Sequence, residues 1–195
     1  MQQNQRSWQQ RATELIEGHR LRGARQVPSP NCNERPRGEV SLVVVHAISL
    51  PPGVFRGDAI EQLFTNRLAA HGHPFFAAIA GLRVSAHLLI RRDGECIQFV
   101  PFDRRAWHAG RSCWQGRSQV NDFSIGIELE GDARPFAAAQ YHRLGGVLQA
   151  LVRSYPGLSL DRVAGHEQIA PLRKEDPGPG FDWQYLKRCL HPVPP

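Results

Sequence analysis

Residues 41–46 read Ser41-Leu42-Val43-Val44-Val45-His46, a continuous apolar run with three successive valines. A run without polar alternation is typical of a strand that is buried on both faces of a sheet. Leu50-Pro51-Pro52-Gly53 follows and ends the strand. The stretch therefore predicts a central strand with His46 at its carboxyl end, where the functional sites of α/β sheets gather.

Other patterned stretches predict the elements around this strand. Asp93-Gly94 lies between apolar runs at 84–90 and 95–100, which predicts a β-hairpin. Residues 124–130 alternate in part and predict another strand, whereas 162–166 fit a short strand or a loop. Three prolines make the stretch 169–180 irregular. Helices are expected at 12–21, 59–70, 137–155 and 182–190, the last with Asp182 as its cap.

Strands, a hairpin and interspersed helices predict an α/β (α+β) fold with a central mixed sheet flanked by helices. The chain has 195 residues, which is enough for one domain with a core that needs no disulfide or metal to hold it together. The first residues are polar and rich in Gln and Arg. We expect a polar extension over residues 1–23 and a single domain over residues 24–195.

Composition excludes several classes of protein. The net charge is +6, but the cations are spread along the chain and do not alternate with aromatic residues, which argues against a nucleic-acid partner. A positive surface also suits an anionic small substrate. No apolar stretch reaches the length of about 18 residues that a membrane span needs. Neither nucleic acid nor membrane is expected as a partner.

The termini and cysteines suggest where the protein works. The N-terminal residues lack the apolar segment and small-residue cleavage site of a secretory signal. The four cysteines are scattered without a CxxC pair, as expected for free thiols in a reducing compartment: Cys32, Cys96, Cys113 and Cys189. The sequence therefore predicts a cytoplasmic protein.

The densest polar cluster lies between residues 165 and 179. His166 and Glu167 are followed by Lys174 and Asp176, which are two residues apart and would point to the same side of an extended segment. A solvated charged loop is the alternative, but prolines stiffen the segment. His166-Glu167 begins like an HExxH zinc motif but lacks the second histidine, so Glu167 is not supported as the general base of that motif.

Two glutamates lie in the strand predicted at 124–130. Glu128 and Glu130 share one face, and burial among Ile and Leu would raise the pKa of either toward that of a general base and acid. A solvated sheet face is the alternative, and periodicity does not choose between the two.

Two histidines, an aspartate and a glutamate match the needs of a hydrolytic zinc site. Zinc with three protein ligands keeps a fourth position for water, whose pKa it lowers, and a carboxylate takes the proton. Spacing alone does not say which two of the nine histidines would bind. Structural roles are the alternative for the remaining candidates: His71, His73, His87 and His108 beside Trp107.

At these residues the chain resembles the cytoplasmic zinc-dependent 1,6-anhydro-N-acetylmuramyl-L-alanine amidases of N-acetylmuramoyl-L-alanine amidase family 2, relatives of the peptidoglycan-recognition proteins. The resemblance runs from about residue 24 to Trp183. It rests on several segments in the same order: Val44-Val45-His46, Ile48-Ser49-Leu50-Pro51-Pro52-Gly53, His73-Pro74-Phe75-Phe76, Leu82-Arg83-Val84-Ser85-Ala86-His87, Leu89-Ile90-Arg91-Arg92-Asp93-Gly94, Arg105-Ala106-Trp107-His108-Ala109-Gly110, residues 121–131, and Asp176-Pro177-Gly178-Pro179.

The resemblance implies a site and a reaction. One zinc per chain would be bound by His46, His166 and Asp176. Glu128 would be the catalytic acid and base, and Lys174 would assist at the oxyanion. The substrate would be an anhydromuramyl peptide, cleaved between its lactyl group and L-alanine by a monomeric enzyme with the fold shared by peptidoglycan-recognition proteins. Arg83 lies in a family-like segment and would help to bind the substrate.

One departure and two alternatives accompany the resemblance. The family pattern has Asn after the first zinc histidine, whereas this chain has Ala47. If that Asn contacts the substrate, a hydrogen bond worth about 0.5–1.5 kcal/mol is missing here unless another group replaces it. A metal-free peptidoglycan-binding module is one alternative, but such modules lack the full ligand set that is present here. An amidase of the intact cell wall is the other, and it would require export.

Overall fold

A mixed sheet of six strands forms the centre of the computed structural model, which describes residues 15–190. The strand order is β12-β5-β11-β6-β7-β3. β12, β5, β11 and β6 run parallel, β7 is antiparallel to β6, and β3 is parallel to β7. The bounds are β3 Arg25–Gln26, β5 Leu42–Ile48, β6 Leu88–Ile90, β7 Cys96–Gln98, β11 Ser124–Glu130 and β12 Val163–Gly165.

Short two-stranded ribbons and helices surround this sheet. The antiparallel ribbons pair β1 Ile16–Glu17 with β2 Arg20–Leu21, β4 Cys32–Glu34 with β8 Arg104–Ala106, and β9 Cys113–Trp114 with β10 Arg117–Ser118. The α-helices are α2 Ala59–Phe64, α3 Pro74–Ile79, α4 Ala138–Ser154, α5 His166–Ile169 and α6 Trp183–Leu190. Two 3₁₀ turns, η1 Ala70–Gly72 and η2 Val120–Asp122, complete the described elements.

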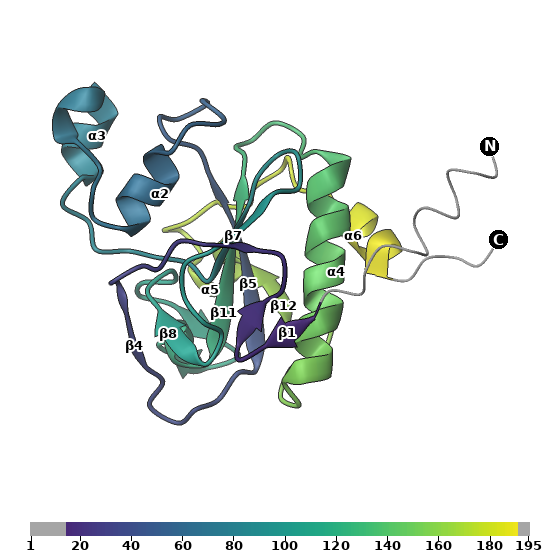
Figure 1. Cartoon of the computed structure of the whole chain (residues 1–195). Helices are drawn as coiled ribbons and strands as arrows, with labels where there is room; N and C mark the ends of the chain where they lie inside the picture. Colours follow the sequence, from purple (N-terminus) through teal and green to yellow (C-terminus); the bar gives the residue numbers. More distant parts are fainter. Residues whose placement is uncertain (1–14, 191–195) are drawn as a thin grey trace, which may run out of the picture.

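The long helix α4 packs along one face of the sheet, and α6 lies against α4 on the side away from the sheet (Figure 1). Leu144, Leu148 and Leu151 of α4 belong to the same buried cluster as Val43, Val45 and Ile127. On the other face, α2 and its neighbours cover a second cluster that includes Leu89 and Ile97. The sheet is therefore a layer between helices, as expected for the predicted fold.

Most of the predicted elements are confirmed. The valine run lies in β5, the 124–130 strand is β11, and Arg91–Gly94 joins the hairpin of β6 and β7. The two C-terminal helices are present as α4 and α6, and Asp182 Oδ1 accepts a hydrogen bond from the Tyr185 N–H at 2.8 Å, as an N-cap does.

Within the described residues, one helix prediction is wrong and another is confirmed only in its first part. The helix expected at 12–21 is instead the hairpin of β1 and β2, because Gly18 and His19 take positive φ values of 53° and 62° and form a tight turn. Ala12 lies outside the described residues. The helix expected at 59–70 ends at Phe64, where Asn66 takes a φ of 60° and turns the chain. Although neither residue lies in a helix, Leu21 in the first segment and Leu68 in the second are both buried.

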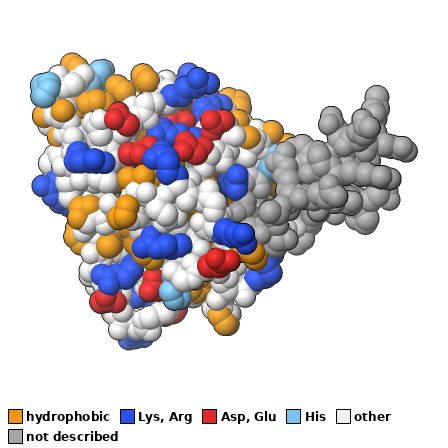
Figure 2. Space-filling view, viewed as in Figure 1, with side chains coloured by type: hydrophobic (Ala, Val, Ile, Leu, Met, Phe, Trp, Pro, Cys, Tyr) orange, Lys and Arg blue, Asp and Glu red, His pale blue; other side chains and the backbone are white. Residues whose placement is uncertain are grey.

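No helix in the range 15–190 combines the length and apolar character that crossing a bilayer requires. Lys and Arg side chains occur at many separate points of the visible surface, with Asp and Glu grouped among some of them above its centre (Figure 2).

Candidate metal centre

Two histidines and an aspartate meet at the carboxyl end of the parallel strands. His46 lies near the end of β5, and His166 begins α5 directly after β12, the strand beside β5. Asp176 comes from the irregular segment that follows α5, and its carbonyl accepts a hydrogen bond from the Glu167 N–H at 2.9 Å. The parallel pairing of β12 with β5 thus brings together residues that are far apart in the sequence.

The three polar atoms form a nearly equilateral triangle. The Nδ1 atoms of His46 and His166 are 3.0 Å apart, and Asp176 Oδ2 lies 3.2 Å and 3.1 Å from them. Tetrahedral zinc with metal–ligand distances of about 2.0–2.1 Å places its ligand atoms about 3.3 Å apart. The spacing of these atoms therefore fits a single zinc ion.

The chemistry of the donors fits as well. Two imidazole nitrogens and one carboxylate oxygen are a ligand set of catalytic zinc, which keeps its fourth position open. Burial lowers the pKa of His46 to about 4, so its imidazole is neutral at pH 7, the form that binds metal. Nε2 of His166 faces the carbonyl oxygen of Ala109 at 3.2 Å. A carbonyl only accepts, so Nε2 of His166 carries a proton, and in the neutral ring Nδ1 presents a lone pair to the cluster.

Glu128 lies next to this cluster on the adjacent strand. It pairs with His46 in the parallel register of β11 and β5, and side chains at paired positions leave the sheet on the same face. Its Oε2 atom is buried without a hydrogen-bond partner among the described residues. Burial, together with repulsion from Asp176, raises the pKa of Glu128 well above its ordinary value. An unpartnered carboxylate oxygen with a raised pKa is suited to take a proton.

Lys174 and Arg83 are more exposed. Lys174 follows α5. Its positive charge contributes to the lowered pKa of His46 and opposes part of the rise in the pKa of Glu128. Arg83 lies on the exposed segment between α3 and β6, and none of the described hydrogen bonds or ion pairs joins it to the cluster. Ala47 packs against the α4 face of the sheet, opposite to His46.

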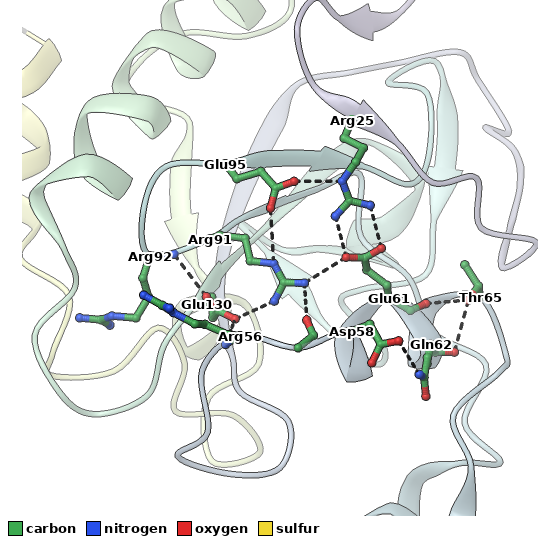
Figure 3. Close-up of polar contacts among 11 residues, drawn as sticks. Arg25, Arg56, Asp58, Glu61, Gln62, Thr65, Arg91, Arg92, Glu95 and Glu130 are labelled. Carbon is green, nitrogen blue, oxygen red and sulfur yellow. Dashed lines mark hydrogen bonds and ion pairs between the residues drawn. The ribbon is translucent and has the colours of Figure 1, made fainter.

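Glu130 occupies a different environment from Glu128, although both lie on one face of β11. Its carboxylate accepts hydrogen bonds from Arg91 Nη1 at 2.7 Å and from the backbone N–H of Arg56 at 2.7 Å. Arg91 also pairs with Glu61, which in turn pairs with Arg25 (Figure 3). Glu130 is 1% exposed and fully engaged in this network, so it is a structural carboxylate.

Two further histidines approach the cluster. His108 Nδ1 lies 2.9 Å from Nε2 of His46, and withdrawal from water holds the pKa of His108 well below its ordinary value. His87 accepts a hydrogen bond from the Gly126 N–H and is buried in the sheet. Sequence patterns do not separate His108 from the other histidines, because its contact to His46 joins two distant segments.

Comparison with known proteins identifies the family. A family model described as N-acetylmuramoyl-L-alanine amidase matches residues 36–179. The chain belongs to the N-acetylmuramoyl-L-alanine amidase family. The chain is 58% identical over 171 residues to the Escherichia coli protein named 1,6-anhydro-N-acetylmuramyl-L-alanine amidase AmpD, covering 87% of this chain and 93% of that one. The Citrobacter freundii AmpD is 54% identical over 180 residues, 91% of this chain and 96% of the relative.

Solved structures of amidases agree with the fold. A crystal structure of a selenomethionine derivative of AmpD superposes with a TM-score of 0.88 at 53% identity, covering 90% of this chain and 99% of that chain. The amidase AmiD from Escherichia coli, in complex with anhydro-N-acetylmuramic acid-L-Ala-D-γ-Glu-L-Lys, superposes with a TM-score of 0.56 at 26% identity, covering 91% of this chain and 65% of that chain. The predicted family and fold are thereby confirmed, and this amidase is an enzyme.

Proposed function

We propose that this amidase uses zinc to hydrolyse the amide bond between the lactyl group of 1,6-anhydro-N-acetylmuramic acid and L-alanine, in the recycling of peptidoglycan fragments. The triangle of His46 Nδ1, His166 Nδ1 and Asp176 Oδ2 carries the proposal, because its edges of 3.0–3.2 Å suit one tetrahedral metal. The names of the relatives support the substrate class.

Zinc, when bound by these three residues, supplies a Lewis acid that polarises the scissile carbonyl and acidifies a water molecule. Glu128 takes the proton from that water through the buried and unpartnered Oε2. The same carboxyl group then returns the proton to the departing nitrogen of L-alanine. One carboxyl group can serve both steps because burial raises its pKa above that of an exposed glutamate, which makes it a stronger base.

Lys174 has a separate role in this scheme. Its positive charge influences the pKa of both His46 and Glu128, which supports a place near the proposed reacting centre. The carbonyl oxygen becomes negative as water adds, and a fixed positive charge at that point stabilises the transition state more than the ground state. We assign Lys174 to the oxyanion and Arg83 to the carboxylates of the substrate peptide.

Within the described residues, none of the four cysteines is joined to another by a disulfide, which fits a reducing compartment. We propose a monomer that acts on cytoplasmic muropeptides. Light scattering of the purified protein and fractionation of cells test these two statements. A domain boundary near residue 24 is also proposed, although Leu21 is buried in the core.

A direct experiment tests the function. Purified protein is incubated with anhydromuramyl tripeptide, and release of the peptide is followed by mass spectrometry, beside parallel reactions with intact cell-wall sacculi. We expect rapid release from the soluble muropeptide, loss of release after chelation, and recovery with zinc. Binding without hydrolysis would favour a peptidoglycan-binding module, and preference for sacculi would favour a cell-wall amidase.

A further inference from the structure

The segment between β8 and β9 contacts the outer nitrogens of both histidines in the metal centre. His46 Nε2 lies 2.9 Å from His108 Nδ1, and His166 Nε2 lies 3.2 Å from the carbonyl oxygen of Ala109. Two consecutive residues of one segment therefore contact both imidazoles at Nε2, on the side away from Asp176. The inner Nδ1 atoms face Asp176.

The hydrogen bonds behind His46 fix its tautomer. The Val120 carbonyl only accepts, so the Ser124 hydroxyl donates to it at 2.7 Å. Ser124 Oγ then accepts from His108 Nε2–H at 3.0 Å, which leaves Nδ1 of a neutral His108 as an acceptor. His46 must donate its Nε2–H to that acceptor.

In the neutral rings, the Nδ1 atoms of His46 and His166 are therefore both without a proton. Two imidazole lone pairs and a carboxylate oxygen thus converge within 3.2 Å, an arrangement that a cation stabilises.

The backbone around His108 is arranged to hold its ring in this position. A Cβ atom on Gly126 would lie 2.4 Å from Cγ of His108, so the ring lies directly on the backbone of β11. The N–H groups of His108 and Ala109 both donate to Asn121 Oδ1, at 3.1 Å and 2.8 Å. Arg173 donates to the Ala109 carbonyl at 2.7 Å. These contacts restrict the movement of the His108 ring and of the Ala109 carbonyl, which contact His46 and His166.

We propose that His108 is a positioning residue of the metal centre, and that Gly126 makes its position possible. By accepting the Nε2–H of His46, His108 keeps the tautomer and ring orientation that present Nδ1 to the metal. The inference rests on the proposed zinc site. Partners of this kind affect metal affinity by about 10–100-fold when they are removed.

The test compares zinc dissociation constants, measured by competition with a chromophoric chelator. His108→Ala should bind zinc about 10–100-fold more weakly than the wild type. His108→Asn keeps an acceptor near the position of Nδ1 and should recover most of the affinity, which a merely structural role would not predict. His71→Ala, at an exposed histidine outside the site, should bind zinc like the wild type.

A second pair of variants tests the contact without removing the histidine. Gly126→Ala should displace the ring and weaken zinc binding, whereas Gly81→Ala, where a Cβ would meet nothing within 4 Å, should not. In the His108→Ala background, Gly126→Ala should cause little further loss, because the two changes remove the same contact.

Distinct outcomes separate the two proposals. Wild-type affinity in both His108→Ala and Gly126→Ala, or losses that simply add in the double variant, would overturn the role of His108. Failure of the wild type to bind one zinc would instead refute the proposed function. Unfolding midpoints of the metal-free variants, measured alongside, distinguish weaker binding from loss of the fold.

Discussion

Among single residues, Glu128 combines a buried, unpartnered oxygen with a position beside the proposed metal ligands. Glu128→Ala should retain zinc but lose turnover by about 10²–10⁴-fold, the usual contribution of general acid–base catalysis. Steady-state kinetics and metal analysis of the same sample check both parts. Unchanged kcat in a zinc-loaded variant would remove Glu128 from the mechanism.

The raised pKa of Glu128 also has a consequence for stability. Between the ordinary value of 4.5 and the raised value, the folded protein binds more protons at this carboxyl than the unfolded chain does. Stability of the metal-free protein therefore falls as pH rises through this window. Glu128→Gln should stabilise the metal-free protein at pH 7 but not below about pH 4. Urea unfolding at the two pH values measures this, with Glu175→Gln at an exposed position as the control. The same change in the free energy of unfolding for both variants would contradict the expected effect of burial.

Lys174 can be tested against a matched partner, because the chain has only one other lysine, Lys187 in α6. Lys174→Ala should lower kcat by about 10²–10³-fold, as the loss of one oxyanion donor does, with a smaller change in KM. Zinc content should stay the same, since lysine is not a ligand. Lys187→Ala should leave both kinetic parameters unchanged. A normal kcat in Lys174→Ala would identify Lys174 as a solvated surface residue.

Among the elements, β11 joins the site to the fold through alternate side chains of one face. Ser124 holds His108, Gly126 makes room for its ring, Glu128 lies beside His46, and Glu130 binds Arg91. The period of two along a strand thus places two carboxylates on the same face in different environments.

The two glutamates of β11 should respond differently to substitution, because only Glu130 lies in an ion-pair network. Glu130→Ala removes the most deeply buried partner of Arg91, which keeps its ion pair with Glu61, and should destabilise the fold by about 1–3 kcal/mol, whereas zinc-loaded, folded enzyme should keep a kcat close to that of the wild type. Glu95→Ala, at the exposed end of the same network, should cost less than about 1 kcal/mol. Urea unfolding measures both. Equal free energies of unfolding for the two variants would show that burial of the Arg91–Glu130 pair is unimportant.

The local sequence predicted the elements with strong hydrophobic periodicity. It did not predict those whose secondary structure depends on a tight turn. β11 and α4 follow from patterns within one segment, but the β1–β2 hairpin depends on Gly18 and His19 turning a polar stretch that fits a helix equally well. The metal cluster is harder still, because strand register brings His46 and His166 together from distant segments. Resemblance to the family, not spacing, singled out those two histidines from nine.

At the scale of the whole molecule, the proposed metal centre joins three segments: the end of β5, the start of α5 and the irregular segment around Asp176. Without a cation, the buried His46 and His166 face a carboxylate across about 3 Å. A metal that binds the folded state alone stabilises it by RT ln(1 + [L]/Kd).

The thermal midpoint should therefore rise continuously with zinc concentration, by an amount equivalent to about 2.7 kcal/mol when free zinc reaches 100 times Kd. Asp176→Ala removes one ligand and should abolish most of this rise, while Asp161→Ala, an exposed aspartate after α4, should preserve it. Differential scanning calorimetry across a zinc-buffered series measures the effect. A midpoint of the wild type that does not depend on zinc would mean that the three segments are held together without metal, and the proposed ligand set would then have to be abandoned.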